Sequence, residues 1–194
     1  MKTLCGSDSK PAAHIFSEKI WQHEVGHFFT DMRFLKAGYG ECSFHGKECG
    51  IPFSTIDCLT ASMPCQAWTR HARTARPGAM PADHAGWDIT FQEFFKLLDH
   101  GKCQIRGGFA EQVVGFAETD NRSSADALQG HTSPWGLFVA ELRSRGFLVS
   151  TFRVNMLDWI NEPARDRLYI VFLGPDMGGR AAMRWMESVV QDCS

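Results

Sequence analysis

Hydrophobic and polar positions along the chain alternate between helical and strand spacing. Apolar residues three and four positions apart predict helices over residues 18–29, 88–100, 134–146 and 181–190. Runs of apolar and β-branched residues predict strands over residues 12–16, 54–60, 105–111, 147–152 and 167–174. Ser133 is the expected N-cap of the third helix, because a serine followed by proline is typical of a helix start.

Strands separated by helices of ten or more residues indicate βαβ units. We therefore expect an α/β fold, with a mostly parallel sheet and helices on both faces. The nearly continuous apolar run at 167–174 is typical of a strand buried on both faces. Ligands of such sheets bind at the carboxyl ends of the strands, so residues that directly follow a strand are the first functional candidates.

Length and composition narrow the class of protein. The chain has 194 residues, of which 44% are hydrophobic and 22% charged, and this predicts one globular core. A net charge of -2 excludes nucleic-acid binding by bulk charge alone. No apolar run approaches the ~20 residues that span a bilayer, so no membrane association is expected. Seven cysteines without CxxC spacing argue against a disulfide framework and for an intracellular location, the nucleus in a eukaryote and otherwise the cytoplasm.

A cysteine follows the strand predicted at 54–60. In Pro64-Cys65-Gln66 the proline restricts the backbone, so the thiol of Cys65 points in a defined direction. A thiol near cationic groups ionises more readily and becomes a nucleophile. The loop predicted at 70–86 begins with such groups, at Arg70, Arg73 and Arg76. The alternative is that Cys65 is a small buried hydrophobic residue, as most cysteines are.

Two further segments carry charged residues at the ends of predicted strands. Glu111 ends the strand at 105–111 and is a candidate proton donor, or else a carboxylate that only reaches solvent. Arg165 and Arg167 precede the strand at 167–174 and suit a phosphate or a polarised carbonyl group. The alternative for this pair is an ordinary charged strand entry, with Asp166 as partner.

In their order along the chain these segments resemble the cytosine-C5 DNA methyltransferase family. Pro64-Cys65-Gln66 resembles the family's Pro-Cys-Gln nucleophile motif, and Glu111-Gln112-Val113 resembles its Glu-Asn-Val motif. Arg165-Asp166-Arg167 resembles its Gln-x-Arg-x-Arg motif. The resemblance covers about residues 13–174 and implies a Rossmann-like methyltransferase fold, incomplete at the N-terminus. Residues 1–12 would then be a disordered or extended N-terminus, and 175–194 a C-terminal helix.

The resemblance implies methyl transfer from S-adenosylmethionine to C5 of cytosine in DNA, through a cysteine adduct. Cys65 would be the nucleophile, and the other implied catalytic residues are Glu111, Arg165 and Arg167. The implied cofactor residues are Glu18 at the ribose, Asp31 at the adenine amino group, and Pro64. The implied DNA contacts are Gln66, Arg70, Arg73 and Arg76. The target base must leave the duplex to reach the thiol.

The chain departs from the family pattern in four places. The family's opening strand with its Phe-x-Gly-x-Gly loop is absent before residue 13, and Gln112 replaces an asparagine. Pro163-Ala164 stands where a glutamine precedes the arginines, and the residues after Gly174 are too few for a target-recognition region. We therefore expect little activity from the isolated chain, and a partner chain or further domain that supplies target recognition.

Two other function classes stay open. One is a non-catalytic interaction module that keeps the methyltransferase fold. The other is a metal protein, because Cys42, His45 and Cys49 have CxxHxxxC spacing, with Cys58 nearby. The spacing is irregular and Cys58 falls in a predicted strand, so no metal ligand is assigned. His27 and His100 are interpreted as solvated or core residues.

Overall fold

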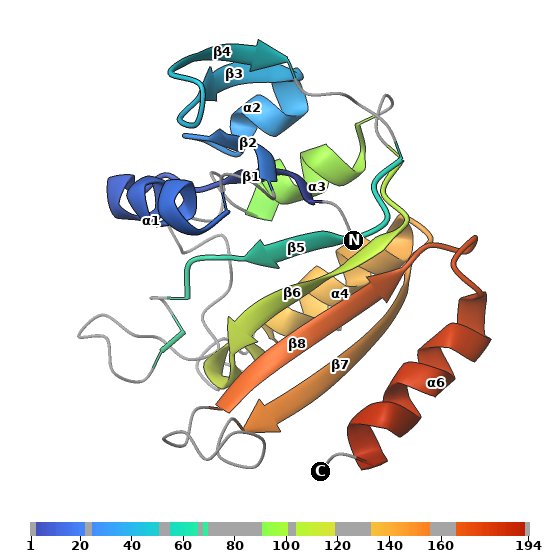
Figure 1. Cartoon of the computed structure of the whole chain (residues 1–194). Helices are drawn as coiled ribbons and strands as arrows, with labels where there is room; N and C mark the ends of the chain where they lie inside the picture. The colour runs from blue at the N-terminus through green and yellow to red at the C-terminus, as the bar shows by residue number, and fades with distance from the viewer. Residues whose placement is uncertain are drawn as a thin grey trace. The chain divides into compact units, whose positions relative to one another are not determined.

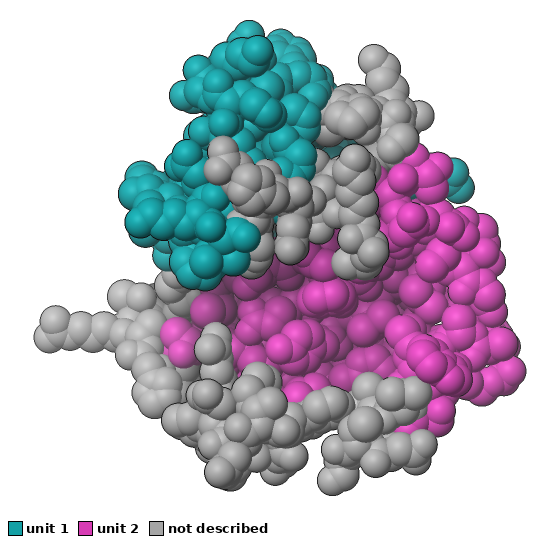
Figure 2. All heavy atoms as spheres, in the orientation of Figure 1, with its two compact units in different colours: residues 1–54, 90–104 teal, residues 55–89, 105–194 magenta. Residues whose placement is uncertain are grey.

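The computed structural model describes residues 3–21, 25–50, 55–65, 68–69, 91–100, 104–118, 133–155 and 166–192. The chain divides into two compact units (Figure 2). Unit 1 comprises residues 1–54 and 90–104, and unit 2 comprises residues 55–89 and 105–194. Each unit contains a four-stranded sheet, whereas the length alone predicted one core.

Unit 1 is built on the sheet β1-β2-β3-β4 (Figure 1). Its elements in chain order are β1 (Thr3–Ser7), α1 (Pro11–Trp21), β2 (Val25–Phe29), α2 (Arg33–Ala37), β3 (Tyr39–Cys42), β4 (Lys47–Gly50) and α3 (Glu93–Leu98). Strands β1 and β2 are parallel, and the other two pairings are antiparallel. Its buried hydrophobic side chains are Val25, Phe28, Phe29, Cys42, Phe91, Phe94, Phe95 and Leu97.

The start of the chain differs from the sequence-based prediction. The strand predicted at 12–16 is wrong, because these residues lie within helix α1. The helix predicted at 18–29 is wrong from Val25 onward, where β2 begins. Short apolar runs are compatible with either structure, and Pro11 favours a helix start here. Strand β1 lies instead at Thr3–Ser7, within the segment expected to be disordered or extended.

Unit 2 is built on the sheet β5-β6-β8-β7, in which the last strand of the chain lies between two earlier ones (Figure 1). Its elements are β5 (Leu59–Ser62), β6 (Gly107–Val113), the 3₁₀ turn η3 (Val114–Ala117), α4 (Pro134–Ser144), β7 (Leu148–Asn155), β8 (Asp166–Leu173) and α6 (Gly179–Asp192). These elements lie within a few residues of the strands and helices predicted for this part of the chain.

The described sheets are mixed. Strands β5 and β6 are parallel, but β8 runs antiparallel to both β6 and β7. Two of the six described pairings are parallel and four are antiparallel, so the prediction of a mostly parallel sheet is wrong for these strands. The α/β class itself agrees with the observed elements.

Helices pack on both faces of β7. The Trp135 indole N–H of α4 donates to the Thr151 hydroxyl at 2.9 Å. The Ser150 hydroxyl donates to Glu187 of α6 at 2.6 Å. Since adjacent residues of a strand point to opposite faces, α4 and α6 cover different faces, as the sequence predicted (Figure 1). No helix in the described part of the chain has the length and hydropathy to cross a bilayer.

Strand β8 alternates in burial along its length. Leu168, Ile170 and Phe172 are buried, whereas the residues between them are partly exposed. The strand is therefore buried on one face, and the prediction of burial on both faces is wrong. Ser133 is the N-cap of α4 as predicted, and its hydroxyl accepts the Gly136 backbone N–H at 3.1 Å.

Candidate active site

Three segments that are far apart in the sequence meet at one end of the unit 2 sheet. Ser62 ends β5 and pairs with Glu111 of β6, and the Ser62 hydroxyl donates to Glu111 Oε2 at 3.0 Å. Arg167, at the start of β8, forms an ion pair through Nε with Glu111 Oε1 at 2.6 Å. Both carboxylate oxygens of Glu111 thus have partners on neighbouring strands, and these partners hold the carboxylate in a defined position.

Cys65 lies three residues beyond Ser62 and is a partly buried free cysteine, next to the partly exposed Pro64. Three residues of chain span at most about 10–11 Å, so the backbone of Cys65 stays close to the strand end that carries Glu111. The Cys65 carbonyl accepts the backbone N–H groups of Trp68 at 3.0 Å and Thr69 at 3.1 Å. These bonds close a turn directly after the thiol.

A buried tryptophan attaches this turn to η3. Trp68 is fully buried, and its ring lies 4.9 Å from that of Phe116 in an edge-to-face arrangement. Gly115 makes the contact possible, because a Cβ atom at this position would lie 2.0 Å from the Trp68 carbonyl oxygen. Neither Trp68 nor Gly115 was predicted from the sequence as part of the site. Glycine after an apolar strand is common, and only the close approach distinguishes Gly115.

Gln112, which departs from the family motif, has a clear structural role. Its side chain is buried, and Nε2 donates to the Met63 carbonyl at 3.1 Å. Its Oε1 accepts the Val113 backbone N–H at 3.3 Å. Met63 lies two residues before Cys65, so Gln112 braces the segment that leads from β5 to the thiol.

The acidic candidates for cofactor binding lie in unit 1. Asp31 follows the end of strand β2, whereas Glu18 is exposed on helix α1 and does not end a strand. Asp8 directly follows β1, and Ser7 pairs with Phe29 at the ends of the parallel strands β1 and β2. Asp8 and Asp31 therefore follow adjacent strand ends. Asp8 was not predicted from the sequence, because the strand was predicted at residues 12–16 and lies instead at Thr3–Ser7.

Asp31 already has a cationic partner. Its carboxylate pairs with the Arg33 guanidinium at 2.5 Å and accepts the Arg33 backbone N–H at 2.8 Å. The hydrogen bond from the Arg33 side chain lowers the pKa of Asp31, against a smaller opposing effect of burial. The Arg33 side chain is 63% exposed, so solvent screens this pair.

Asp31→Asn is expected to lower the stability of unit 1 at pH 7 by less than about 1 kcal/mol, as for other exposed ion pairs. Because folding lowers the pKa of Asp31, the stabilisation is present above the ordinary carboxylate pKa and is lost as the pH falls through the folded value. Thermal unfolding of the parent chain and of Asp31→Asn, at pH 7 and at about pH 2.5, measures the difference in stability between them. A difference that stays the same at the lower pH would contradict this prediction.

The remaining predicted site residues lie outside the described part of the chain. These are the catalytic candidate Arg165 and the DNA-contact candidates Gln66, Arg70, Arg73 and Arg76. The structure therefore brings together Glu111 and Arg167, with Cys65 on the segment that follows β5. It places Asp31 in the other unit.

Comparisons with known proteins agree with a partial methyltransferase fold. No protein-family model and no curated protein sequence matches the chain. The crystal structure of S. pombe Dnmt2 methyltransferase matches 89% of this chain, with a TM-score of 0.50 and 18% identity. A mutant of Spodoptera frugiperda DNMT2 matches 90% of it, with a TM-score of 0.50 and 15% identity. The chain spans 42% and 43% of those two proteins, so the likeness is one of fold over less than half of each.

Proposed function

We propose that this chain carries the catalytic half-site of a cytosine-C5 methyltransferase that acts on DNA, with Cys65 as the nucleophile. The observation that carries the proposal is the ion pair of Glu111 on β6 with Arg167 on β8, because β6 also pairs with β5, the strand that leads to Pro64-Cys65. The ion pair joins two of the resembling motifs, and the third begins two residues after Ser62, whose hydroxyl donates to Glu111. The partial fold likeness to Dnmt2-type methyltransferases supports the same class.

The proposed chemistry begins with addition of the Cys65 thiolate to C6 of the cytosine ring. This addition moves electron density to C5, which is otherwise a poor nucleophile. S-adenosylmethionine, when bound, supplies an electrophilic methyl group. Glu111 exchanges a proton with N3 of the ring, and Arg167 holds Glu111 in place and stabilises charge on the O2 side of the base. Once C5 carries the methyl group, its proton passes to water, the electron pair of that C–H bond re-forms the C5–C6 double bond, and Cys65 leaves C6 as the thiolate.

The acidic residues of unit 1 are chemically suited to the adenosyl part of this cofactor. Carboxylates accept hydrogen bonds from ribose hydroxyls and from an adenine amino group. Asp8 follows β1 and is exposed. Within the described residues, its carboxylate accepts a hydrogen bond from the backbone N–H of Lys10, two residues further along the chain. We therefore assign the ribose role to Asp8 in place of Glu18, and keep Asp31 for the adenine amino group. Methylation of DNA also implies an intracellular location and a partner or domain that recognises the target.

Covalent trapping tests the role of Cys65. DNA with 2-pyrimidinone at the target position lacks the electron-donating amino group, so its C6 accepts a thiolate without methyl transfer. DNA with 5-fluorocytosine forms a lasting adduct only after methyl transfer, because the C5 fluorine cannot leave as a proton does. We expect a denaturation-resistant complex on 2-pyrimidinone DNA, at least tenfold reduced in Cys65→Ala. Cys58→Ala removes another thiol of unit 2 and is expected to leave the complex unchanged.

The two substrates separate the possible functions. An adduct on both means a complete methyltransferase reaction, and an adduct on 2-pyrimidinone alone means a half-site that needs a further domain. A folded protein that forms no adduct on either would overturn the proposal and favour the non-catalytic interaction module. An adduct that persists in Cys65→Ala would overturn the assignment of the nucleophile.

A further inference from the structure

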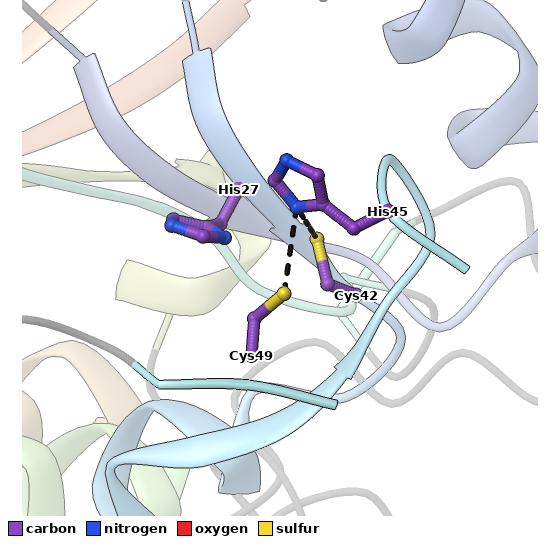
Figure 3. Close-up of side chains that lie close together, drawn as sticks. All are labelled: His27, Cys42, His45 and Cys49. Carbon is purple, nitrogen blue, oxygen red and sulfur yellow. Dashed lines mark hydrogen bonds between the residues drawn. The ribbon is translucent and has the colours of Figure 1, made fainter. Parts of the chain in front are cut away.

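Four side chains with metal-binding atoms converge in unit 1. They are His27 on β2, Cys42 at the end of β3, His45 in the β3–β4 turn and Cys49 on β4. One ligand atom from each residue lies within 4.8 Å of those of the other three. The close-up view shows the two imidazoles and two thiols gathered around one point (Figure 3). None of the four belongs to the site proposed for methyl transfer.

The strand register explains why these residues share one face of the sheet. Phe29 pairs with Cys42, and His27 lies two residues before Phe29 on β2. Cys49 pairs with Gly40, which lies two residues before Cys42 on β3. Because side chains alternate between faces, residues two apart and residues directly paired point the same way. His27, Cys42 and Cys49 therefore project from the same face.

The β3–β4 turn brings His45 back over this face. The Cys42 carbonyl accepts the backbone N–H of His45 at 3.3 Å and that of Gly46 at 2.9 Å. Gly46 has a φ of 60°, in the left-handed region that glycine adopts without strain. The turn thus returns the chain sharply enough to place the His45 ring beside two sulfur atoms.

The distances from His45 to the two sulfur atoms fit a tetrahedral metal centre. His45 Nδ1 lies 3.3 Å from Cys42 Sγ and 3.4 Å from Cys49 Sγ (Figure 3). A zinc ion bound at about 2.3 Å to sulfur and about 2.0–2.1 Å to nitrogen separates tetrahedral S and N ligands by about 3.5 Å. These two separations are within a few tenths of an ångström of that value, and the full set of four ligand atoms, which lie within 4.8 Å of one another, would close in around the ion.

The surroundings of His27 also point to a ligand. Its Nδ1 atom is buried and has no hydrogen-bond partner within the described residues. A buried polar atom without a partner costs free energy, which a coordinate bond would recover.

We propose that His27, Cys42, His45 and Cys49 bind one structural zinc ion. Two thiolates and two imidazoles form a closed tetrahedral set typical of structural zinc, with no position left for a reacting ligand. The site modifies the metal hypothesis drawn from the sequence, because the fourth residue of the group is His27, which was interpreted as a solvated or core residue, and not Cys58. Cys58 is exposed in unit 2 and is not a member of the group.

The zinc ion would stabilise a sheet whose strands are short. Strands β3 and β4 have four residues each, and the four ligands connect both of them to β2. Small folding units with few buried hydrophobic residues are commonly stabilised by a metal or a disulfide. Here the ion would join the β3–β4 hairpin to the rest of unit 1.

Metal analysis of the full chain, purified from medium with added zinc and then dialysed against a weak chelator, tests this proposal. We expect about one zinc ion per chain in the parent and in Cys58→Ser, and less than a fifth of that in Cys49→Ser or Cys42→Ser. Replacement of zinc by cobalt(II) adds a readout on the parent protein that does not depend on variants. Tetrahedral coordination by two thiolates gives intense d–d bands and a sulfur-to-cobalt charge-transfer band.

The outcomes are distinct. Stoichiometric zinc with the tetrahedral cobalt spectrum supports the site, even where the cysteine variants fail to fold. Substoichiometric metal in the parent would overturn the proposal, and so would a Cys42–Cys49 disulfide. Zinc that is retained in folded Cys49→Ser would also overturn it. Because Cys65 takes no part, failure of the trapping experiment leaves this result unaffected, and the reverse is equally true.

Discussion

Gly115→Ala is expected to destabilise unit 2 by about 1–3 kcal/mol or more and to reduce adduct formation by Cys65 at least tenfold. The new methyl group would lie 2.0 Å from the Trp68 carbonyl oxygen, where ordinary contacts are 3.4–4 Å. The Trp68 backbone must move, although its N–H is bonded to the Cys65 carbonyl and its ring is packed on Phe116. Movement of this turn therefore shifts the thiol. Urea denaturation followed by circular dichroism, together with the trapping yield, measures both effects.

Gly136→Ala is the matched control. Gly136 lies in α4, and a Cβ atom there would meet only the Ser133 hydroxyl oxygen, at 3.5 Å. Alanine reduces the conformational freedom of the unfolded chain, so this variant is expected to be more stable by about 0.4–1 kcal/mol. Equal urea midpoints for the two variants would contradict the close approach at Gly115.

Phe172→Ala is expected to cost about 3–5 kcal/mol, the range for truncation of a buried phenylalanine. Phe172 is fully buried on β8, and its ring contacts that of Phe147 edge-to-face at 5.3 Å. The Phe172 ring also fills space that Gly108 leaves open, because a Cβ atom on Gly108 would lie 2.8 Å from this ring. Loss of the ring leaves a cavity beneath the centre of the sheet. Because whole domains are stable by only about 5–15 kcal/mol, unit 2 is expected to melt at a much lower temperature.

Phe109→Ala provides the comparison within the same sheet. Phe109 on β6 is 37% exposed, and its ring lies 6.3 Å from that of Tyr169. Its truncation is expected to cost about 1 kcal/mol or less. Thermal unfolding of both variants by differential scanning calorimetry gives the comparison. A loss for Phe172→Ala no larger than that for Phe109→Ala would contradict the observed packing.

The sequence predicted the second half of the fold better than the first. Ser133-Pro134 and the long apolar strand at 166–173 are strong local signals, and the structure has a helix and a strand there. The run at 12–16 is too short for its periodicity to separate helix from strand. The antiparallel insertion of β8 between β6 and β7 could not be predicted, because strand order depends on long-range packing.

The candidate site also contains residues that could be predicted from the sequence and residues that could not. Cys65, Glu111 and Arg167 could be predicted as site residues because each belongs to a short motif in a recognisable order. The residues that position them were not found, since Trp68 and Gly115 act through one close contact that leaves no local pattern. In the metal site, Cys42, His45 and Cys49 are close in sequence, but His27 comes from a neighbouring strand.

The discontinuity of unit 1 has a consequence for synthesis on the ribosome. Residues 90–104 complete this unit, and α3 within them contributes Phe94, Phe95 and Leu97, all of which are buried. The chain grows by about 5–20 residues per second, so residues 1–54 wait several seconds for α3. During that interval the ligands His27, Cys42, His45 and Cys49 have all been made. Early zinc capture would therefore give the nascent chain a local ordered centre before the buried residues of α3 are synthesised.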